Sequence, residues 1–376
     1  MQKIVILINS LESGGAERVV SNLLNLWVEK YECYLILIHN YKFYELNSKV
    51  TIFSLNESKE YSGIKKLFRL PILAYKLNQI IQKNNFNQII SFLTRANYIN
   101  ILSNIFIKHK TIVNERAMPS LQYQYGLNGK INRFLIKSLY SKSDLCLSNS
   151  HGNMMDLKNN FNIANLSYVH NPFNLEMIQT MSKKEIEIEK KRFTFVTVGR
   201  LDKGKNHKLI MDAIKNIDAD LWIIGDGKLK EELQSYIKKL NLNDKVYLLG
   251  KKENPFAYIS KVDCFIFTSN HEGFPNVLVE ALACGLPIIS TDCQSGPREI
   301  LAPNSDVSFQ LKDNVEFAEY GILSPVKNVE KMKEAMSLII NDESLRKNYQ
   351  EKSKFRANDF KIEEIIKQYE EILCVE

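Results

Sequence analysis

The sequence predicts an α/β protein built from two Rossmann-like domains, each a doubly wound parallel sheet with helices on both faces. Short apolar runs alternate with helical patterns through the first half of the chain, and the same alternation restarts after a charged segment at 183–192. The length of 376 residues exceeds one ordinary core and fits two domains of roughly 170 to 200 residues each.

The first half supplies six predicted strands and five predicted helices. The strands are 4–9, 33–39, 51–55, 88–93, 111–114 and 144–148, and the helices are 16–29, 64–83, 97–108, 130–141 and 152–160. Ligands of parallel sheets bind at the carboxyl ends of the strands. Gly14 and Gly15 follow the first strand and open the next helix, so we expect them at that edge. A flexible turn would also account for them, because the Gly-x-Gly-x-x-Gly spacing is absent.

The second half repeats the pattern beyond a boundary that we predict after Phe173. Its strands are predicted at 193–198, 221–224, 245–249, 262–268, 287–291 and 321–323, and its closing helices at 329–341, 343–358 and 362–374. The expected domains are therefore 1–173 and 174–360, with a closing segment at 361–376. Each half reads as a parallel sheet in its own right.

The stretch from Thr268 to Gly285 carries the most specific local pattern. It follows an apolar run typical of a buried strand, and Pro275 suits the first turn of a helix that we expect to end near Cys284. Glu272 then lies in the loop before the helix and Glu280 about one turn inside it. A helix N-terminus attracts phosphate, and carboxylates beside it can take hydroxyl groups. This layout fits a sugar nucleotide.

Three motifs together give a family resemblance. Glu272 and Glu280 form a Glu-x7-Glu pair, Gly199–Asn206 reads GRLDKGKN, and Ser13–Arg18 reads SGGAER. In this order, each at a strand end, they resemble the retaining glycosyltransferases of family 4, and the resemblance covers nearly the whole chain. It implies the GT-B fold, in which the last helix, here 361–376, crosses back onto the first domain.

The resemblance also implies roles for residues. Arg200 and Lys205 would stabilise the charge of a leaving nucleoside diphosphate without a metal, although a solvated basic loop would explain them too. Glu272 would hold the donor sugar and Glu280 the ribose. Asn114-Glu115-Arg116 stands where many family members have a histidine, which makes Glu115 the substitute candidate. The full expected substrate-binding set is Gly14, Gly15, Arg200, Lys205, Lys251, Glu272, Gly273, Phe274, Pro275, Asn276, Val277 and Glu280.

No metal site or cofactor is expected. Asp218-Ala219-Asp220 resembles a metal-binding Asp-x-Asp, but it precedes the strand 221–224 and so falls at the amino end of the sheet. We therefore expect the metal-independent mechanism that the resemblance implies. The expected donor is a nucleotide sugar, UDP-HexNAc or UDP-hexose.

Charge is divided unevenly along the chain. Residues 1–173 hold 20 Lys and Arg against 10 Asp and Glu, and residues 174–376 hold 30 against 33. No nucleic-acid motif accompanies the basic half, so an anionic membrane or a phosphorylated substrate is the expected partner. The segment 64–76, with 106–110, interleaves basic and apolar residues and is a candidate membrane surface, or else a core helix with a solvated back. No apolar run is long enough to span a membrane.

These observations lead to one expected function and two alternatives. We expect a glycosyltransferase at the inner face of the cytoplasmic membrane that acts on polyprenyl-diphosphate-linked glycans, similar to bacterial N-acetylgalactosamine transferases of lipid-linked oligosaccharide and surface-polysaccharide pathways. A UDP-N-acetylhexosamine 2-epimerase shares the GT-B fold but would need further acid and base residues. The protein could also be a membrane-binding scaffold with an inactive nucleotide site, but the motif residues would then be present without a catalytic role.

Overall fold

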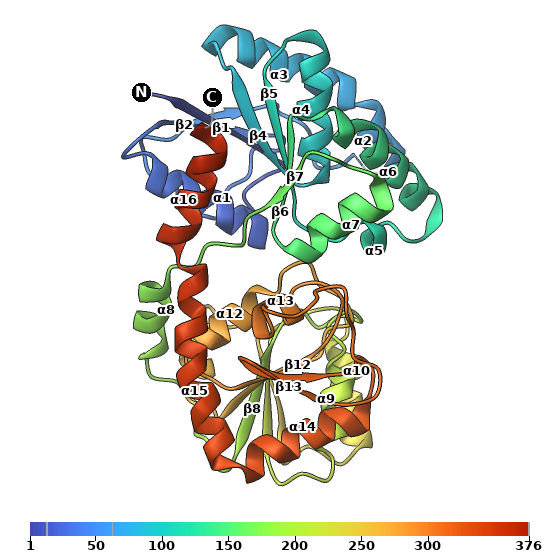
Figure 1. Cartoon of the computed structure of the whole chain (residues 1–376), viewed down its shortest axis with the longest axis vertical. Coiled ribbons are helices and arrows are strands. Elements are labelled where there is room, and N and C mark those ends of the chain that lie inside the picture. Colours follow the sequence, from blue (N-terminus) through green and yellow to red (C-terminus); the bar gives the residue numbers. More distant parts are fainter. Residues whose placement is uncertain (13, 62, 375–376) are drawn as a thin grey trace. The chain divides into compact units, whose positions relative to one another are not determined.

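The computed structural model describes residues 1–12, 14–61 and 63–374, and it divides into two compact units, 1–171 and 172–376. This division lies two residues before the predicted boundary. Each unit contains one seven-stranded sheet with helices on both of its faces (Figure 1).

The sheet of the first unit is parallel throughout, in the order β3-β2-β1-β4-β5-β6-β7. Its strands are β1 (Lys3–Ile8), β2 (Glu32–Leu37), β3 (Thr51–Ser54), β4 (Gln88–Phe92), β5 (Lys110–Glu115), β6 (Leu145–Ser148) and β7 (Leu166–Tyr168). Its helices are α1 (Gly15–Trp27), α2 (Gly63–Phe68), α3 (Leu70–Asn84), α4 (Thr94–Phe106), α5 (Pro119–Gln122), α6 (Gly126–Leu139) and α7 (His151–Phe161), with a 3₁₀ turn at Tyr140–Lys142. The strand order reverses between β1 and β4, as in dinucleotide-binding sheets.

The sheet of the second unit has the order β10-β9-β8-β11-β12-β14-β13, with β13 antiparallel at its edge. Its strands are β8 (Thr194–Val198), β9 (Asp220–Ile224), β10 (Val246–Gly250), β11 (Cys264–Phe267), β12 (Ile288–Thr291), β13 (Glu316–Ala318) and β14 (Gly321–Ser324). Its helices are α8 (Leu175–Ser182), α9 (His207–Ile214), α10 (Lys230–Lys239), α11 (Pro255–Ile259), α12 (Asn276–Ala283), α13 (Pro297–Leu301), α14 (Val329–Asn341), α15 (Glu343–Ala357) and α16 (Ile362–Cys374), with a 3₁₀ turn at Asn358–Phe360. The order again reverses, between β8 and β11.

One predicted helix, 64–83, is two helices in the structure. The break falls at Arg69, between α2 and α3, and the Arg69 guanidinium donates a 2.9 Å hydrogen bond to the buried carboxylate of Glu57. Pro71 stands in the first turn of α3 and has no N–H to donate to the Leu67 carbonyl, so it interrupts the single helix that the apolar pattern predicted.

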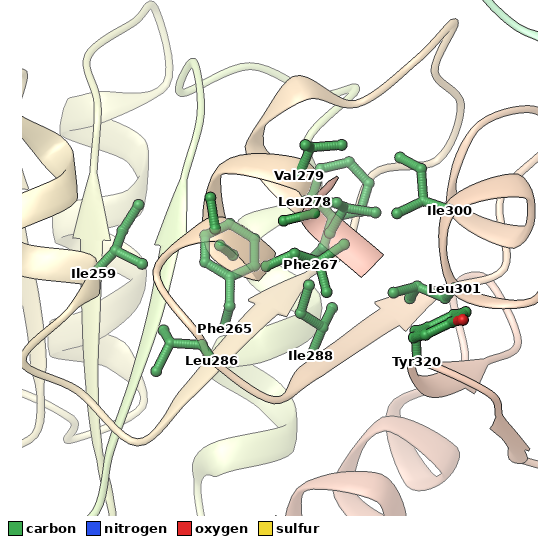
Figure 2. Packing of buried hydrophobic residues seen from close by; sticks show 14 of the residues in the cluster. Ile259, Phe265, Phe267, Leu278, Val279, Leu286, Ile288, Ile300, Leu301 and Tyr320 are labelled. Atoms are coloured by element: carbon green, nitrogen blue, oxygen red, sulfur yellow. The ribbon is translucent and has the colours of Figure 1, made fainter. Parts of the chain in front are cut away.

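The core of the second unit fixes the helix that follows β11. Phe265 and Phe267 of β11, Leu278 of α12 and Ile288 of β12 are each at most 2% exposed and pack together (Figure 2). This packing holds the start of α12 at the carboxyl edge of the sheet. Within the described parts of the chain, no helix is both long and apolar enough to cross a membrane.

Candidate active site

Two loops meet where the strand order of the second unit reverses. One loop, 199–206, follows β8, and the other, 268–275, follows β11, and these two strands are hydrogen-bonded neighbours. Ligands of open α/β sheets bind at such a switch point, outside the carboxyl ends of the strands. The predicted residues Arg200, Lys205 and Glu272 therefore belong to one edge of one sheet.

Direct hydrogen bonds tie the two loops together. Thr268 Oγ1 donates to the Lys205 carbonyl at 3.0 Å, and the Asn270 amide donates to the Gly204 carbonyl at 2.8 Å. The Asn206 side chain donates to Asn270 Oδ1 at 3.3 Å. The first two bonds use the backbone carbonyls of Lys205 and Gly204, so they fix the position of the Lys205 backbone independently of its side chain.

Lys205 and Glu272 form an ion pair across the loops. Lys205 Nζ lies 2.5 Å from Glu272 Oε1 and 5.6 Å from the centre of the Phe267 ring. The two side chains are 19% and 16% exposed, so the pair is partly shielded from solvent. Arg200 differs: its side chain is 82% exposed and lies 3.3 Å from Asp202. The site thus combines a fixed ammonium, a fixed carboxylate and a guanidinium that reaches into solvent, which suits an anionic group carrying hydroxyls.

The loop that continues from Glu272 is packed on both sides. Phe274 is 6% exposed and meets the Phe360 ring edge-on at 5.6 Å. Ser295 Oγ donates to the Gly273 carbonyl at 2.8 Å, and a Cβ placed on Gly296 would lie 2.2 Å from Pro275 Cδ. The loop after Glu272 is therefore packed against the turn at Ser295 and Gly296, which precedes α13.

The remaining predicted residues of this unit lie along α12 and after β10. Asn276 and Val277 begin α12, and Glu280, five per cent exposed, lies in its second half. Lys251 is exposed directly after β10. Because α12 begins at Asn276, Glu280 lies about one turn inside the helix, and its contact with a ribose stays a prediction.

Sequence reasoning missed a second glycine turn at this edge. Gly225 and Gly227 follow β9, and a Cβ on Gly225 would lie 1.9 Å from the Gly199 carbonyl oxygen. A Cβ on Gly227 would lie 2.6 Å from the Leu201 carbonyl oxygen. Both glycines allow the β9 loop to press against the Arg200 loop. The signal was present as Gly-Asp-Gly directly after a predicted strand.

Gly14 and Gly15 belong to the first unit and lie where expected, after β1 and at the start of α1. The Tyr44 hydroxyl donates to the Gly14 carbonyl at 3.2 Å. A Cβ on Gly14 would lie 2.1 Å from a carboxylate oxygen of Glu17, whose pKa is raised by burial. Ser13 of the motif lies outside the described residues.

Glu115 ends β5 and is enclosed by its own unit. It is 2% exposed and accepts hydrogen bonds from the Tyr140 hydroxyl at 2.6 Å, from Thr94 Oγ1 at 3.1 Å and from the Arg116 amide at 3.0 Å. Burial raises the pKa of this carboxyl despite these donors. A contact with a donor sugar would require these bonds to be broken, so that role stays a prediction.

Both acidic residues of Asp218-Ala219-Asp220 pair with a cation. Arg192 donates to Asp218 at 3.0 Å and to Asp220 at 2.7 Å, at the amino end of β9. Over the described ranges, no group of three or more His, Cys, Asp or Glu side chains is arranged to hold a metal ion.

A family model described as "Glycosyl transferases group 1" matches residues 179–356, which span most of the second unit and both of its site loops. Relatives match the whole chain. The N-acetylgalactosamine-N,N'-diacetylbacillosaminyl-diphospho-undecaprenol 4-alpha-N-acetylgalactosaminyltransferase of Campylobacter jejuni is 38% identical over 96% of both chains. A second Campylobacter jejuni enzyme, a GalNAc-alpha-(1->4)-GalNAc-alpha-(1->3)-diNAcBac-PP-undecaprenol alpha-1,4-N-acetyl-D-galactosaminyltransferase, is 27% identical over 100% of this chain and 99% of its own.

Solved structures share the two-unit architecture at low identity. Anabaena HepE in complex with UDP and glucose has a TM-score of 0.76 at 17% identity, with both chains covered fully. A sucrose-phosphate synthase of Thermosynechococcus elongatus has a TM-score of 0.80 at 16% identity, covering 99% of this chain and 98% of its own. The predicted GT-B fold is confirmed by these neighbours together with the two parallel-sheet units.

Proposed function

Because this chain belongs to the glycosyl transferases group 1 family and is a glycosyltransferase, we propose that it transfers an N-acetylhexosamine or hexose from a UDP-sugar to a glycan carried on a polyprenyl diphosphate. The whole-length relative at 38% identity, which by its name acts on a diphospho-undecaprenol glycan, carries the proposal. The epimerase and the inactive scaffold receive no support, because the family and the relatives above are transferases.

The charges at the switch point support a metal-independent transfer, and the resemblance to family 4 implies that the transfer is retaining. Arg200 and Lys205 stabilise the negative charge that develops on the leaving diphosphate, and Glu272 holds hydroxyls of the donor sugar. A phosphate oxygen of the leaving group receives the acceptor proton. The chain needs no cofactor besides the donor, so we expect full activity in EDTA. Activity that EDTA abolishes and added Mg²⁺ or Mn²⁺ restores would overturn the metal-independent part.

The surface charge of the first unit supports contact with an anionic membrane. Between Glu60 and Asp144 the chain carries thirteen Lys and Arg and one acidic residue, Glu115, which is buried. Large apolar side chains are exposed on the helices of the same span, namely Phe68, Ile72, Tyr75, Ile105, Phe106, Leu127 and Phe134. Basic and apolar side chains together are the composition of surfaces that lie on anionic lipid.

The structure shows that only some of the basic residues in the predicted membrane surface face outward. In the predicted segment 64–76, Arg69 bonds the buried Glu57, and Lys76 Nζ donates to the Leu55 carbonyl at 2.8 Å. Lys65 is exposed and Lys66 is half-buried. The side chain of Ile64 lies outside the described part of the chain. Helix α6, absent from the predicted surface, adds its own exposed lysines, so the proposed membrane surface is wider than the segment.

A donor and acceptor panel tests the proposal. The purified chain is incubated with UDP-GalNAc, UDP-GlcNAc, UDP-galactose and UDP-glucose, each with short prenyl-diphosphate glycans, and the products are read by mass spectrometry. We expect one donor to add a single mass increment to at least one lipid-linked glycan. Release of free sugar without transfer to any such acceptor would contradict the proposed acceptor class.

A further inference from the structure

The connection between β2 and β3 exposes aromatic rings at the carboxyl edge of the first sheet. Tyr41 is 46% exposed and Phe43 is 57% exposed. Their backbones pair with the turn after β1: the Leu11 amide donates to the Tyr41 carbonyl at 2.9 Å, and the Phe43 amide donates to the Leu11 carbonyl at 2.7 Å. Exposed aromatic rings on backbone that is held in place form a rigid surface rather than a loose loop.

Hydrogen bonds to α1 hold the rest of this connection. Ser21 Oγ and Asn25 Nδ2 both donate to the Glu45 carbonyl, at 3.2 and 3.1 Å, and the Asn47 amide donates to Asn25 Oδ1 at 2.8 Å. The Tyr44 hydroxyl bonds the Gly14 carbonyl, which joins the connection to the glycine turn. None of these bonds uses the face of an aromatic ring.

A hollow of about 550 Å³ lies along this connection. Its lining mixes aromatic, aliphatic, charged and amide side chains, and it consists of Lys42–Ser48 with Val50 and Ile52. Small-molecule sites have volumes of this order and combine apolar walls with a few polar groups. A pyranose ring matches such a lining, because its C–H face packs on an aromatic ring while its hydroxyls take hydrogen bonds.

We propose that the aromatic loop, residues 41–48, is a saccharide-binding subsite that holds a sugar of the acceptor glycan other than the one that reacts. The inference rests on the proposed function. The glycine turn follows β1 at the switch point, and the aromatic loop follows β2, one strand outward. Adjacent strands lie roughly 5 Å apart, which is the scale of one sugar unit.

Charge favours a saccharide over a lipid surface at this place. Within residues 41–60, the exposed lysines Lys42, Lys49 and Lys59 are accompanied by the exposed Glu45 and Glu60, and Lys49 pairs with Glu29 at 2.9 Å. Lys59 is further neutralised by Glu12 at 2.7 Å, and its ammonium lies 4.1 Å from the centre of the Tyr41 ring. A balanced surface gains nothing from anionic lipid, whereas the neutral, hydroxyl-rich glycan needs no net charge.

The test compares acceptors of different glycan length with Phe43→Ala, Phe43→Tyr and Tyr41→Ala. We expect Phe43→Ala to raise KM about tenfold for a prenyl-diphosphate trisaccharide, the scale of one lost aromatic contact. Transfer to a prenyl-diphosphate monosaccharide and hydrolysis of the UDP-sugar should not change, and Phe43→Tyr should restore the KM. Phe355→Ala removes a phenylalanine that is 68% exposed on α15 and serves as the matched control.

Each outcome decides the proposal. Equal KM values for wild type and Phe43→Ala on the trisaccharide, or equal losses on both acceptors, would overturn the subsite. Saturation-transfer NMR with the soluble trisaccharide, free of lipid and phosphate, should show ring contacts that Tyr41→Ala weakens, and a signal that survives in both alanine variants would also overturn it. Failure of the wild type to use any lipid-linked glycan would instead contradict the proposed function.

Discussion

At the scale of single residues, the pairing of Lys205 with Glu272 is the feature most open to test. A donor diphosphate would compete with Glu272 for the ammonium, since the two side chains are 2.5 Å apart. We expect Lys205→Ala, Glu272→Ala and Arg200→Ala each to lower kcat/KM by roughly 10²-fold or more. The double variant Lys205→Ala/Glu272→Ala should be little worse than the poorer single variant, because the pair acts as a unit.

Lys203 provides the control for these variants. It lies in the same loop and is exposed, and only its backbone carbonyl takes part in the bonds between the loops, at 3.1 Å from Asn270 Nδ2. Lys203→Ala should keep near-normal kcat/KM and thermal unfolding. Near-normal turnover in the three site variants, with unchanged unfolding, would refute the assignment of the site.

Glu115 gives a second residue-scale prediction, in the dependence of stability on pH. Burial raises the pKa of its carboxyl above the ordinary value of about 4.3. The folded state then holds this proton more tightly than the unfolded state, so the contribution of Glu115 to stability is greatest below the unfolded pKa and falls as pH rises through the folded pKa. Glu115→Gln removes the titration, and the hydroxyls of Tyr140 and Thr94 can turn to accept its amide protons.

Urea unfolding of wild type and Glu115→Gln at pH 4 and pH 8 measures this difference. The stability of the variant relative to wild type should increase between the two pH values. A difference that is the same at both pH values would mean that the carboxyl titrates alike in the folded and unfolded states. If the variant also loses kcat while UDP-sugar binding is kept, Glu115 acts in the reaction as well.

The sequence could identify the site residues one by one but not their contacts. The positions of Arg200, Lys205 and Glu272 followed from motifs at strand ends. Their separation of up to 72 positions gives no sign that Lys205 reaches Glu272 while Arg200 points to solvent. Burial of Glu115 was also hidden, because a glutamate at the end of a strand is more often exposed.

At the scale of elements, we expect the turn before α13 to affect donor binding, because it packs against the loop that follows Glu272. Gly296 has φ +86° and its Cβ would lie 2.2 Å from Pro275, so Gly296→Ala strains the backbone and pushes the loop after Glu272. We expect UDP binding to weaken about tenfold or more by calorimetry, beyond a stability loss of roughly 1 to 3 kcal/mol from the backbone.

Gly126 separates the two effects. It has φ +76°, but a Cβ there would meet nothing within 4 Å. Gly126→Ala should therefore lose a similar amount of stability and keep normal UDP affinity. Equal UDP affinities in the two variants would show that the Gly296 turn does not position the loop.

Length decided which elements the sequence could predict. The helices at 329–341 and 362–374 were predicted with the bounds that the structure gives, because long amphipathic patterns carry a strong periodic signal. Strands β7 and β13 were missed, since three residues are too few for a pattern to emerge. The packing of the last helix on the first domain stays a prediction.

At the scale of the whole molecule, the two sheets repeat one topology but not one chemistry. In both, the first three strands run in reverse order beside the fourth and fifth. The repeat was predictable from the restart of the alternation. The second unit carries the paired charges of Lys205 and Glu272, where we propose that the donor binds. The first unit carries the unbalanced basic charge, which a count of charged residues in the sequence is enough to show.

That charge leads to the last prediction, that the first unit binds anionic vesicles through α2 and α6. Each lysine near an anionic surface contributes about 1 kcal/mol, so losing two should weaken binding by roughly 30-fold. Lys65→Ser/Lys66→Ser tests α2, and Lys130→Ser/Lys137→Ser tests the exposed lysines of α6. Arg69 is left intact, because it is one of two arginines, with Arg95, that neutralise the buried Glu57.

The control is Lys238→Ser/Lys239→Ser, which removes two exposed lysines from α10 in the second unit and the same formal charge. Co-sedimentation with phosphatidylglycerol vesicles at low and high salt should separate the three variants, because screening shortens the reach of exposed charges to about 10 Å at 0.1 M salt. An equal loss in all three would assign binding to net charge alone. Binding that ignores salt would reject the electrostatic argument and leave the exposed apolar side chains of α2 and α6 as its source.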